Sequence, residues 1–445
     1  MYTVPIPGDP ESPNFRVFDS AAGPRLLVIP HSRIFAIPTE FAEALRTGEP
    51  SAVAEVEAFA GTIRGETSLD LVPDTTPQSI SLNVSSSCNL RCNYCYARGG
   101  AFDGAQNSTM TWEVGRAAVD RLLTLANPAA PITIGFIGGE PFLNRKLVHR
   151  LVEYADSRSQ QRGLMVRFSV TTNGTVLNRD DIGLIRNHPF AITVSIDGGR
   201  TLQEGQRPMH SGRSSFAELR RAITPLLEDS GQAKIAARAT VIRDDLNIAS
   251  RFDDILKLGF REVGFSPVRS APPMTVALHG PDWRRYLDAM IELADREIVG
   301  ARAGATLRLT NLAIALKQLH RGFAMPFPCG AGGGYFSVGA DGTWYACHRA
   351  IGQEAYALGD NSGLDQARRN SFLRDRHVHS QRECRSCWAR YLCSGGCHHE
   401  ASARDDSSCG FVRGWLEYCL RTYSEIVGGR PEWFEDSNQV SELSI

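Results

Sequence analysis

The chain has 445 residues, of which 42% are hydrophobic, and its formal net charge at pH 7 is −1. This length is sufficient for two or three globular domains with ordinary cores. The balanced charge argues against broad binding to nucleic acid or to a membrane surface, and no apolar stretch reaches the roughly 18 residues that a membrane span requires.

The N-terminal residues predict a small α+β module. Apolar runs at residues 15–18, 25–29 and 33–37 are separated by turn residues, a pattern typical of a small antiparallel sheet. Helical spacing of apolar residues follows between residues 41 and 59. The first twelve residues lack the basic start and apolar core of a signal peptide, so we expect a cytoplasmic protein.

From residue 80 onward, apolar strands alternate with helical stretches. Six candidate strands cover residues 81–84, 132–137, 166–170, 191–195, 235–242 and 262–265. Strands that alternate with helices pair in parallel through crossover connections. Six units predict an α/β fold, a partial TIM-like (β/α)6 barrel rather than a closed barrel of eight. In such barrels the reactive residues gather at the C-terminal ends of the strands.

Three cysteines follow the first of these strands with CxxxCxxC spacing: Cys88, Cys92 and Cys95. A 4Fe–4S cubane takes four ligands, so three thiolates would leave one iron open to a reactant. Structural zinc sites usually pair CxxC with a second, distant pair, and disulfides are uncommon in a cytosolic chain. The loop therefore predicts a catalytic iron–sulfur cluster, with zinc as the alternative.

The ends of the next strands carry glycines and polar side chains. Glycines let the backbone approach a ligand, and a carboxylate there can meet a cationic group. One such turn alone is a weak signal, but their order at successive strand ends indicates a shared ligand site. These residues are Gly138, Gly139, Glu140 and Pro141 after the second strand, Asn173 after the third, and Ser195, Asp197 and Arg207 at or after the fourth.

With this cysteine loop and these strand-end motifs, residues 80–270 resemble the radical SAM enzymes. The resemblance implies that Cys88, Cys92 and Cys95 bind a 4Fe–4S cluster whose open iron holds the methionine part of S-adenosyl-L-methionine. An electron from the cluster then releases a 5′-deoxyadenosyl radical, which abstracts hydrogen from the substrate. The implied cofactor contacts are Tyr94 beside the adenine, Gly138, Gly139, Glu140 and Pro141 at the amino group, Ser195 and Arg207 at the carboxylate, and Asn173 and Arg238 as further contacts.

The later cysteines resemble the SPASM extension of radical SAM enzymes, which typically carries two auxiliary 4Fe–4S clusters. A zinc ribbon over residues 384–397 is the alternative. Cys409 is preferred to Cys419 as the last ligand, because Cys419 lies in an apolar helical pattern where cysteine usually acts as a small hydrophobe. The resemblance implies one cluster on Cys329, Cys347 and Cys397 and another on Cys384, Cys387, Cys393 and Cys409.

Two positions depart from the anaerobic sulfatase maturases of this architecture. Tyr335 stands where those enzymes have a further cysteine, and His348 stands where they have an acidic base. The first auxiliary cluster would then have an open iron or a ligand other than cysteine. Residues 347–352 and 357–360 instead resemble maturases that cross-link ribosomally made peptides, especially those that form thioethers.

We therefore expect an enzyme that installs an intramolecular thioether cross-link in a peptide or protein. Carbon–carbon cyclophane formation, dehydrogenation like that of a sulfatase maturase, and a non-enzymatic metal-stabilised binding scaffold are the alternatives. No residue is assigned as catalytic, since Asp197, His398 and His399 also suit ordinary turn and surface roles. Expected partners are a precursor peptide and a flavodoxin- or ferredoxin-type reductant, with neither nucleic acid nor membrane.

The expected organisation has five parts. Residues 1–75 form a winged-helix-like module that resembles the peptide-recognition element of peptide maturases, which binds a leader as an added strand; a simple packing cap is the alternative. The other parts are the barrel at 80–270, a helical bridge at 271–324, the SPASM domain at 325–425 and a tail at 426–445.

Overall fold

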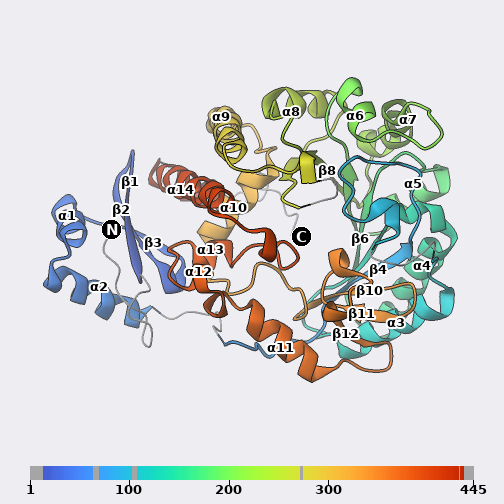
Figure 1. Ribbon diagram of the computed structural model, residues 1–445, viewed down its shortest axis with the longest axis horizontal. Helices are drawn as coiled ribbons and strands as arrows, with labels where there is room; N and C mark the ends of the chain where they lie inside the picture. Colours follow the sequence, from blue (N-terminus) through green and yellow to red (C-terminus); the bar gives the residue numbers. More distant parts are fainter. Residues whose placement is uncertain (1–13, 64–69, 103–107, 271–273, 430, 435–445) are drawn as a thin grey trace. The chain divides into compact units, whose positions relative to one another are not determined.

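The computed structural model describes residues 14–63, 70–102, 108–270, 274–429 and 431–434 (Figure 1). The chain forms two compact units, each assembled from separate segments. The barrel unit comprises the described residues within 74–279 and 330–372, and the terminal unit comprises those within 1–73, 280–329 and 373–442. Residues 435–445 of the expected tail lie outside the described residues, and the five expected domain boundaries stay predictions.

A nine-stranded sheet dominates the barrel unit, with the order β12-β11-β10-β4-β5-β6-β7-β8-β9. The six strands β4 to β9 are parallel and adjacent in chain order, as expected for a partial barrel. The bounds are β4 (Ser79–Ser85), β5 (Ile132–Gly138), β6 (Val166–Thr172), β7 (Phe190–Ser195), β8 (Lys234–Val241), β9 (Val263–Pro267), β10 (Tyr335–Val338), β11 (Thr343–Tyr345) and β12 (Ala357–Asp360).

Three strands extend this sheet beyond the six that the sequence predicts. β10 pairs in parallel with β4, and β11 and β12 follow by antiparallel pairing. Residues that are more than 250 positions apart therefore lie on neighbouring strands, as in the hydrogen bond from Ser337 to the Ser81 carbonyl.

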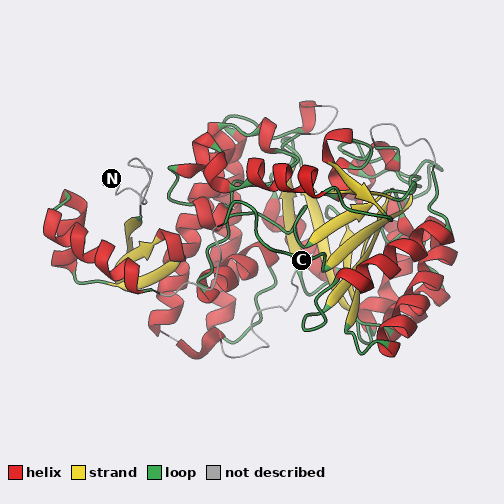
Figure 2. Cartoon of the chain, turned by 90° about the horizontal axis from the view of Figure 1, so that it is seen from below, coloured by secondary structure: helices red, strands yellow, loops and turns green. Residues whose placement is uncertain are grey.

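Neighbouring rows of side chains that run across the strands of the sheet differ in side-chain size. Ile80, Ile134, Phe168 and Phe190 form one fully buried row across four strands. The adjacent row starts with Ser81, Gly135 and Ser169, and a Cβ on the glycine would meet both serine hydroxyls. Side chains alternate between the faces of a sheet, so the large residues pack on one face and small residues line the other. Figure 2 shows helices covering one side of these strands.

The helices of the barrel unit connect its parallel strands. α5 begins with a capping box in which Asn178 and Asp181 satisfy each other's backbone N–H groups, as the sequence Asn-Arg-Asp-Asp allows. The bounds are α3 (Trp112–Leu125), α4 (Arg145–Gln161), α5 (Arg179–Asn187), α6 (Arg200–Gln206), α7 (Ser215–Glu228), α8 (Ile248–Lys257), and the 3-10 helices η2 (Arg98–Gly100), η3 (Pro141–Asn144), η4 (Met274–Val276), η5 (His348–Ala350) and η6 (Glu354–Tyr356).

The terminal unit contains the expected small antiparallel sheet, in the order β1-β2-β3. Phe15, Leu26, Val28, Leu45 and Val56 form its core with the first two helices. The bounds are β1 (Phe15–Ser20), β2 (Gly23–Val28), η1 (Ile29–His31), β3 (Arg33–Ala36), α1 (Thr39–Thr47) and α2 (Pro50–Thr62).

The rest of the terminal unit is helical, including the expected bridge region. α14 packs against α9, α10 and β1. The bounds are α9 (Asp282–Arg302), α10 (Thr310–Arg321), η7 (Val378–Ser380), α12 (Arg382–Arg385), α13 (Arg390–Cys393), η8 (Ala401–Ala403), α14 (Asp406–Gly429) and η9 (Pro431–Phe434), while α11 (Gln366–Arg376) has residues in both units.

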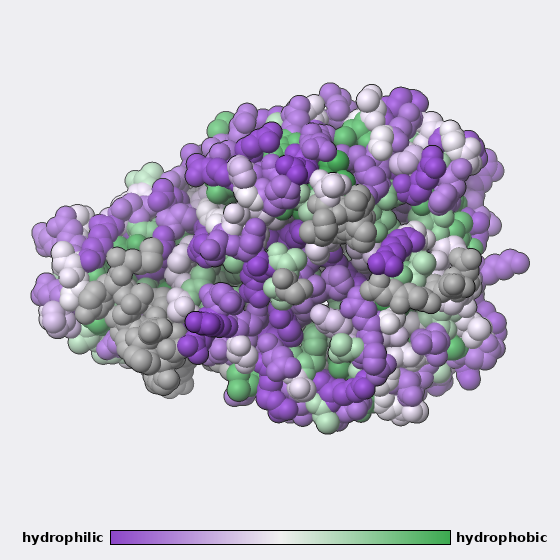
Figure 3. All heavy atoms as spheres, viewed as in Figure 1, coloured by the Kyte–Doolittle hydropathy of each residue, from purple (hydrophilic) through white to green (hydrophobic). Residues whose placement is uncertain are grey.

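The visible surface is mainly hydrophilic, with small apolar areas between the polar ones (Figure 3). Among the described residues, no helix has both the length and the apolar character needed to cross a membrane.

Candidate active site

The cysteine loop begins directly after β4 and is held along its backbone. The Arg91 amide donates to the Pro208 carbonyl at 2.9 Å, and the Asn93 amide donates to the Gln206 carbonyl at 3.1 Å. The His210 amide donates back to the Asn89 carbonyl at 3.1 Å. The segment that follows α6 therefore fixes the path of the loop between its cysteines.

The glycine turn after β5 packs against the chain just before Cys88. The Gly139 amide donates to the Ser85 carbonyl at 2.8 Å, and the Glu140 amide donates to the Ser87 carbonyl at 2.9 Å. Gly138 has φ +151°, and a Cβ on either glycine would overlap the Ser85 or Ser87 carbonyl oxygen. These glycines let the turn approach the start of the cysteine loop, and their approach to a bound ligand stays a prediction.

Glu140 connects the ends of two strands. Its fully buried carboxylate accepts hydrogen bonds from the Thr172 hydroxyl at 2.7 Å and from the Asn173 amide at 2.8 Å. Burial raises the pKa of Glu140 to about 7, although these hydrogen bonds act in the opposite direction. The Asn173 side chain in turn lies 3.7 Å from the Cys88 sulfur. Glu140 therefore orients a residue that touches the cysteine loop.

Asp197 is the centre of a buried polar network at the end of β7. It accepts a hydrogen bond from the Tyr94 hydroxyl and two from Arg207, at 3.0 and 3.2 Å. The Thr240 amide donates a further hydrogen bond to it at 2.9 Å, and the residue is fully buried. The Arg207 guanidinium lies over the Tyr94 ring and 4.0 Å from the Cys92 sulfur. Asp197 thus orients two predicted cofactor residues.

Ser195 and Arg238 are direct register partners on β7 and β8. Arg238 is exposed and donates a hydrogen bond to the Ser266 hydroxyl at 3.1 Å. Directly paired residues of parallel strands point to the same face of a sheet. The structure therefore places both predicted contacts side by side, while Pro141 is buried at the start of η3.

The three thiols of the loop influence one another. Burial raises the pKa of Cys88 to about 12, and Glu140, Cys92 and Cys95 add to this effect. Burial also raises the pKa of Cys92 to about 11, while Arg207 acts in the opposite direction. A cation at this position would draw the thiols into their thiolate form, since metal binding displaces the proton.

Tyr96 links this loop to a later cysteine of the barrel unit. It lies within electrostatic range of both Cys95 and Cys347, and 38% of it is exposed. The Arg349 guanidinium lies 4.9 Å from its ring centroid, and the His348 ring lies 6.4 Å away. The cysteine loop and the segment that begins at Cys347 therefore share one neighbourhood.

Tyr335 occupies the same neighbourhood. Its hydroxyl donates a hydrogen bond to the Ser81 hydroxyl at 3.1 Å and lies 2.9 Å from Nδ1 of His348. The phenol oxygen is therefore engaged by two protein groups at the start of β10.

Residues 82–232 match the family model described as the radical SAM superfamily. The chain contains a radical SAM domain. It is accordingly a radical SAM enzyme, whose cofactors are S-adenosylmethionine and 4Fe–4S clusters. The matched residues include the cysteine loop, the glycine turn, Asp197 and Arg207, which together form the site described above.

The radical SAM chain is 25% identical over 378 residues to the serine-type anaerobic sulfatase-maturating enzyme of Klebsiella aerogenes, covering 79% of this chain and 87% of that relative. Among solved structures, anSMEcpe with bound AdoMet has a TM-score of 0.67 at 20% identity, over 80% of this chain and 100% of that one. Streptococcus suis SuiB has a TM-score of 0.52 at 13% identity, over 89% and 97% of the two chains. Both likenesses confirm the fold predicted for a radical SAM enzyme with a SPASM extension.

The donor set of the radical SAM loop suits a cluster better than a single metal ion. A cubane takes cysteine thiolates on separate irons and leaves one iron open when a loop supplies only three. Cys88, Cys92 and Cys95 are the residues that would hold such a cluster, on a loop whose path the backbone fixes.

Cysteines of the terminal unit form a second group, consistent with an auxiliary cluster. Burial raises the pKa of Cys384, and the neighbouring Cys387 and Cys409 add to this effect. Cys419 is instead fully buried on α14, and burial alone raises the pKa of its thiol. Cys409 is thus an electrostatic neighbour of Cys384, and its assignment as the last ligand in preference to Cys419 stays a prediction. Cys393 belongs to the same unit at the end of α13.

The first auxiliary ligand set stays a prediction from the family resemblance. Cys347 is buried in the barrel unit, whereas Cys329 is exposed and Cys397 half-buried in the terminal unit. His398 is buried and within hydrogen-bond distance of Arg376, at 2.9 Å.

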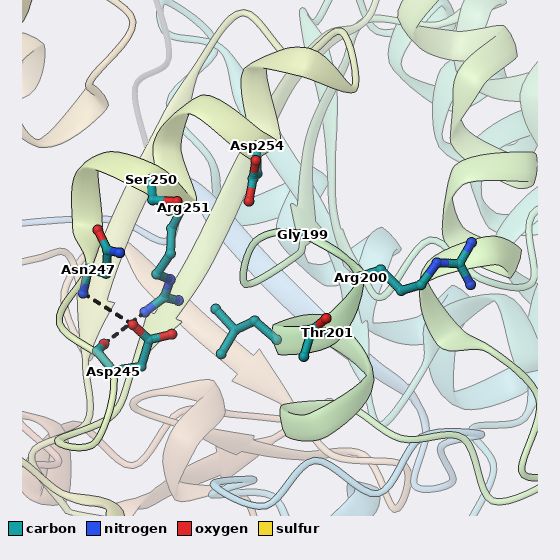
Figure 4. A pocket seen from close by; sticks show the side chains of 9 residues that line it. Gly199, Arg200, Thr201, Asp245, Asn247, Ser250, Arg251 and Asp254 are labelled. Atoms are coloured by element: carbon teal, nitrogen blue, oxygen red, sulfur yellow. Dashed lines mark hydrogen bonds between the residues drawn. The ribbon is translucent and has the colours of Figure 1, made fainter.

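A separate pocket of about 280 Å³ lies between the first turns of α6 and α8. Figure 4 shows Arg251 directed toward Asp245, with Thr201 and Arg200 on the other wall. Arg251 donates hydrogen bonds to the carbonyls of Asp197, Thr240 and Asp245, so it braces the end of the barrel. None of the predicted cofactor residues lines this pocket.

Sequence reasoning gave Asp197 no firm role, although the structure places it at the centre of the site. Its position two residues after Ser195 at a strand end was the available signal, but Asp-Gly also forms ordinary turns. Tyr96 and Arg251 had no comparable signal, because their roles depend on segments distant in the sequence.

Proposed function

We propose that this radical SAM enzyme is a maturase that installs a thioether cross-link within a ribosomally made peptide or protein. The observation that carries the proposal is the engagement of the Tyr335 hydroxyl by Ser81 and His348. Tyr335 occupies the position at which anaerobic sulfatase maturases are expected to have a cysteine. A first auxiliary cluster without that thiolate has a coordination position that a substrate cysteine can take.

The bound cofactor supplies one-electron abstraction of a hydrogen atom from the substrate. Among the chain's own residues, Asp197 holds Tyr94 and Arg207 beside the loop that would bear the cluster. Thioether formation removes one hydrogen atom from carbon, one proton from the thiol and one electron. That electron leaves through an auxiliary cluster.

The N-terminal sheet supports recognition of a leader peptide by strand addition. β1 packs against α14, whereas β3, the other outer strand, has exposed Arg33 and Ala36. An outer strand offers unpaired backbone groups to an extended peptide. SuiB has been solved with its precursor peptide SuiA, which supports a peptide as the partner class here. A flavodoxin- or ferredoxin-type protein is proposed as the reductant.

A truncated chain tests this recognition. Removal of residues 1–75 is expected to weaken binding of the precursor peptide at least tenfold, measured by fluorescence anisotropy. Iron content and circular dichroism of the truncated chain control for loss of the remaining fold. Unchanged peptide affinity in a folded truncated chain contradicts the recognition role and supports the packing cap.

Oxidation of a serine or cysteine side chain in a protein substrate is the second candidate. The similarity to a serine-type anaerobic sulfatase-maturating enzyme, over 79% of this chain, favours it. The departures at Tyr335 and His348 favour the cross-link. Carbon–carbon cyclophane formation shares the same cofactors and is a further outcome of the test.

The test uses the anaerobically reconstituted enzyme and the peptide encoded by a neighbouring short reading frame. A cross-link and serine oxidation both remove two hydrogens, so mass alone does not separate them. A thioether is expected to make the peptide unreactive toward iodoacetamide and toward an aldehyde-reactive hydrazide. A hydrazide adduct supports the second candidate, and a product that retains its alkylatable thiol supports the cyclophane.

Replacement of Tyr335 provides a further prediction. Tyr335→Cys supplies the missing thiolate, so it is expected to abolish cross-linking while 5′-deoxyadenosine still forms from S-adenosylmethionine and reductant. Tyr335→Phe is the control, because it removes the hydroxyl without adding a ligand. Cross-linking by Tyr335→Cys at the wild-type rate contradicts a role for the open coordination position.

A further inference from the structure

A guanidinium group contacts a cysteine of the terminal unit directly. Nη1 of Arg404 lies 2.7 Å from the sulfur of Cys384, and Nη2 donates a hydrogen bond to Oε1 of Gln381 at 2.7 Å. Cys384 and Gln381 are both buried. The fork of the arginine therefore spans a sulfur and an amide oxygen, which fixes its orientation.

Gln381 is itself held in place. Its side-chain amide donates to the Arg376 carbonyl at 2.8 Å, and its oxygen also accepts from the Arg376 guanidinium at 3.4 Å. Gly395 has φ +77° and lacks space for a Cβ, which would press on the Gln381 amide. Gln381, which holds the Arg404 guanidinium, is therefore itself fixed by the surrounding cysteine segment. The position of the guanidinium beside Cys384 is accordingly well defined.

The charge on Arg404 also differs from that on the arginine near the radical SAM loop. Arg207 approaches Cys92 at 4.0 Å but is neutralised by its two hydrogen bonds to Asp197. Among the described residues, Arg404 forms no ion pair with a carboxylate. Its positive charge therefore acts mainly on the sulfur of Cys384.

Hydrogen bonds to the ligand sulfurs and the local net charge are major determinants of the potential of an iron–sulfur cluster. A reduced cluster carries one more negative charge than an oxidised one. A cation and an N–H donor at a ligand sulfur stabilise the reduced form more, because charge-assisted hydrogen bonds strengthen with the charge of the acceptor.

We propose that Arg404 raises the reduction potential of the auxiliary cluster on Cys384, Cys387, Cys393 and Cys409. This cluster then accepts the single electron that the substrate releases as its new bond forms, passing from the 2+ to the 1+ state. The inference rests on the proposed function, because that function requires both the auxiliary cluster and an oxidation that releases an electron. Arg404 is a positioning residue and does not touch the substrate.

The test measures the potential of the auxiliary clusters in the full-length, reconstituted chain. Cys88, Cys92 and Cys95 are replaced by alanine to remove the signal of the radical SAM cluster. A titration followed by electron paramagnetic resonance then compares Arg404→Met with the unaltered Arg404. At a fixed potential, the ratio of reduced to oxidised cluster is expected to fall about tenfold in one couple, equivalent to about 59 mV for a one-electron step.

Arg382→Met is the matched control, because Arg382 is exposed on α12 near Cys384. Water and salt screen its charge, so its removal is expected to change the ratio less than twofold. Arg404→Lys retains the charge but not the fork, and an intermediate change is expected. An Arg404→Met chain that keeps both clusters and their potentials overturns the inference.

A second measurement is independent of these variants, in case Arg404→Met does not retain the cluster. The chain with alanine at positions 88, 92 and 95 is prepared with 15N-labelled arginine. Its spectrum is expected to show a hyperfine coupling between an arginine nitrogen and one reduced auxiliary cluster. No such coupling overturns the inference while the proposed function stands. Absence of auxiliary iron in the unaltered chain instead overturns the proposed function itself.

Discussion

At the residue scale, the site depends on one buried carboxylate that three segments share. Asp197 joins Tyr94 from the cysteine loop, Arg207 from the end of α6 and the Thr240 amide on β8. A fully buried carboxylate is stable only with such partners, and its loss would leave the buried Arg207 without its counterion. The hydrogen bonds of this one side chain therefore join the cysteine loop to the ends of two strands.

Asp197→Asn is expected to lower the free energy of unfolding by about 3 kcal/mol and to weaken the binding of S-adenosylmethionine. The cause is the unpaired charge of Arg207 and the loss of a fixed Tyr94. Chemical denaturation and isothermal titration with the cofactor measure the two effects.

The double substitution Asp197→Asn with Arg207→Met serves as the comparison. It removes both charges, so much of the stability is expected to return without recovery of cofactor binding. An Asp197→Asn chain with wild-type stability and affinity contradicts the role assigned to this carboxylate.

At the element scale, the turn after β5 is fitted to the chain before Cys88. Gly138 and Gly139 allow two backbone segments to meet without side chains, and hydrogen bonds from Gly139 and Glu140 join them. The glycines act here as a contact surface for the loop that holds the cluster, in addition to their expected place near the cofactor.

Gly139→Ala is expected to displace the cysteine loop and reduce the iron and sulfide bound by the triad by at least half. The added methyl group would overlap the Ser87 carbonyl oxygen, and overpacking of this kind typically costs about 1–3 kcal/mol. Gly183→Ala is the control, because no atom lies within 4 Å of a Cβ at that helical position. Equal iron content in both variants contradicts the packing role.

At the scale of the whole molecule, each unit is assembled from segments distant in the sequence. In the terminal unit, Arg16 of β1 forms an ion pair with Glu417 of α14 at 2.7 Å and lies 4.4 Å from the Trp388 ring. Trp388 follows Cys387 directly. The N-terminal sheet is thereby packed onto the cysteine segment of its own unit.

Arg16→Ala is expected to lower the free energy of unfolding by about 1–2 kcal/mol, since a partly buried ion pair and a cation–π contact are both lost. Urea denaturation measures the change. Arg46→Ala removes the well-exposed ion pair to Asp19 in the same module and is expected to cost less than about 0.5 kcal/mol. Similar losses in both variants contradict the structural importance of Arg16.

The sequence predicts the six parallel strands well, because each one is a distinct apolar run that ends in a turn. Residues 132–137 correspond to β5 (Ile132–Gly138) and residues 191–195 to β7 (Phe190–Ser195). β10, β11 and β12 were beyond such reasoning, since they are only three or four residues long and join the sheet through pairing with distant β4. The cysteine triad could also be recognised from the sequence, because its three members lie within eight residues of one another. The buried network around Asp197 could not, because its members are brought together only by the fold.

The pairing of β10 with β4 also has a consequence for biosynthesis. Ser337 and Ser81 are 256 positions apart, so most of the chain is translated before β4 gains its second neighbour. Until then one edge of β4, directly before the cysteine loop, has unpaired backbone groups. The strand that leads into Cys88, Cys92 and Cys95 therefore gains its second hydrogen-bonded neighbour only after residues 335–338 have been made.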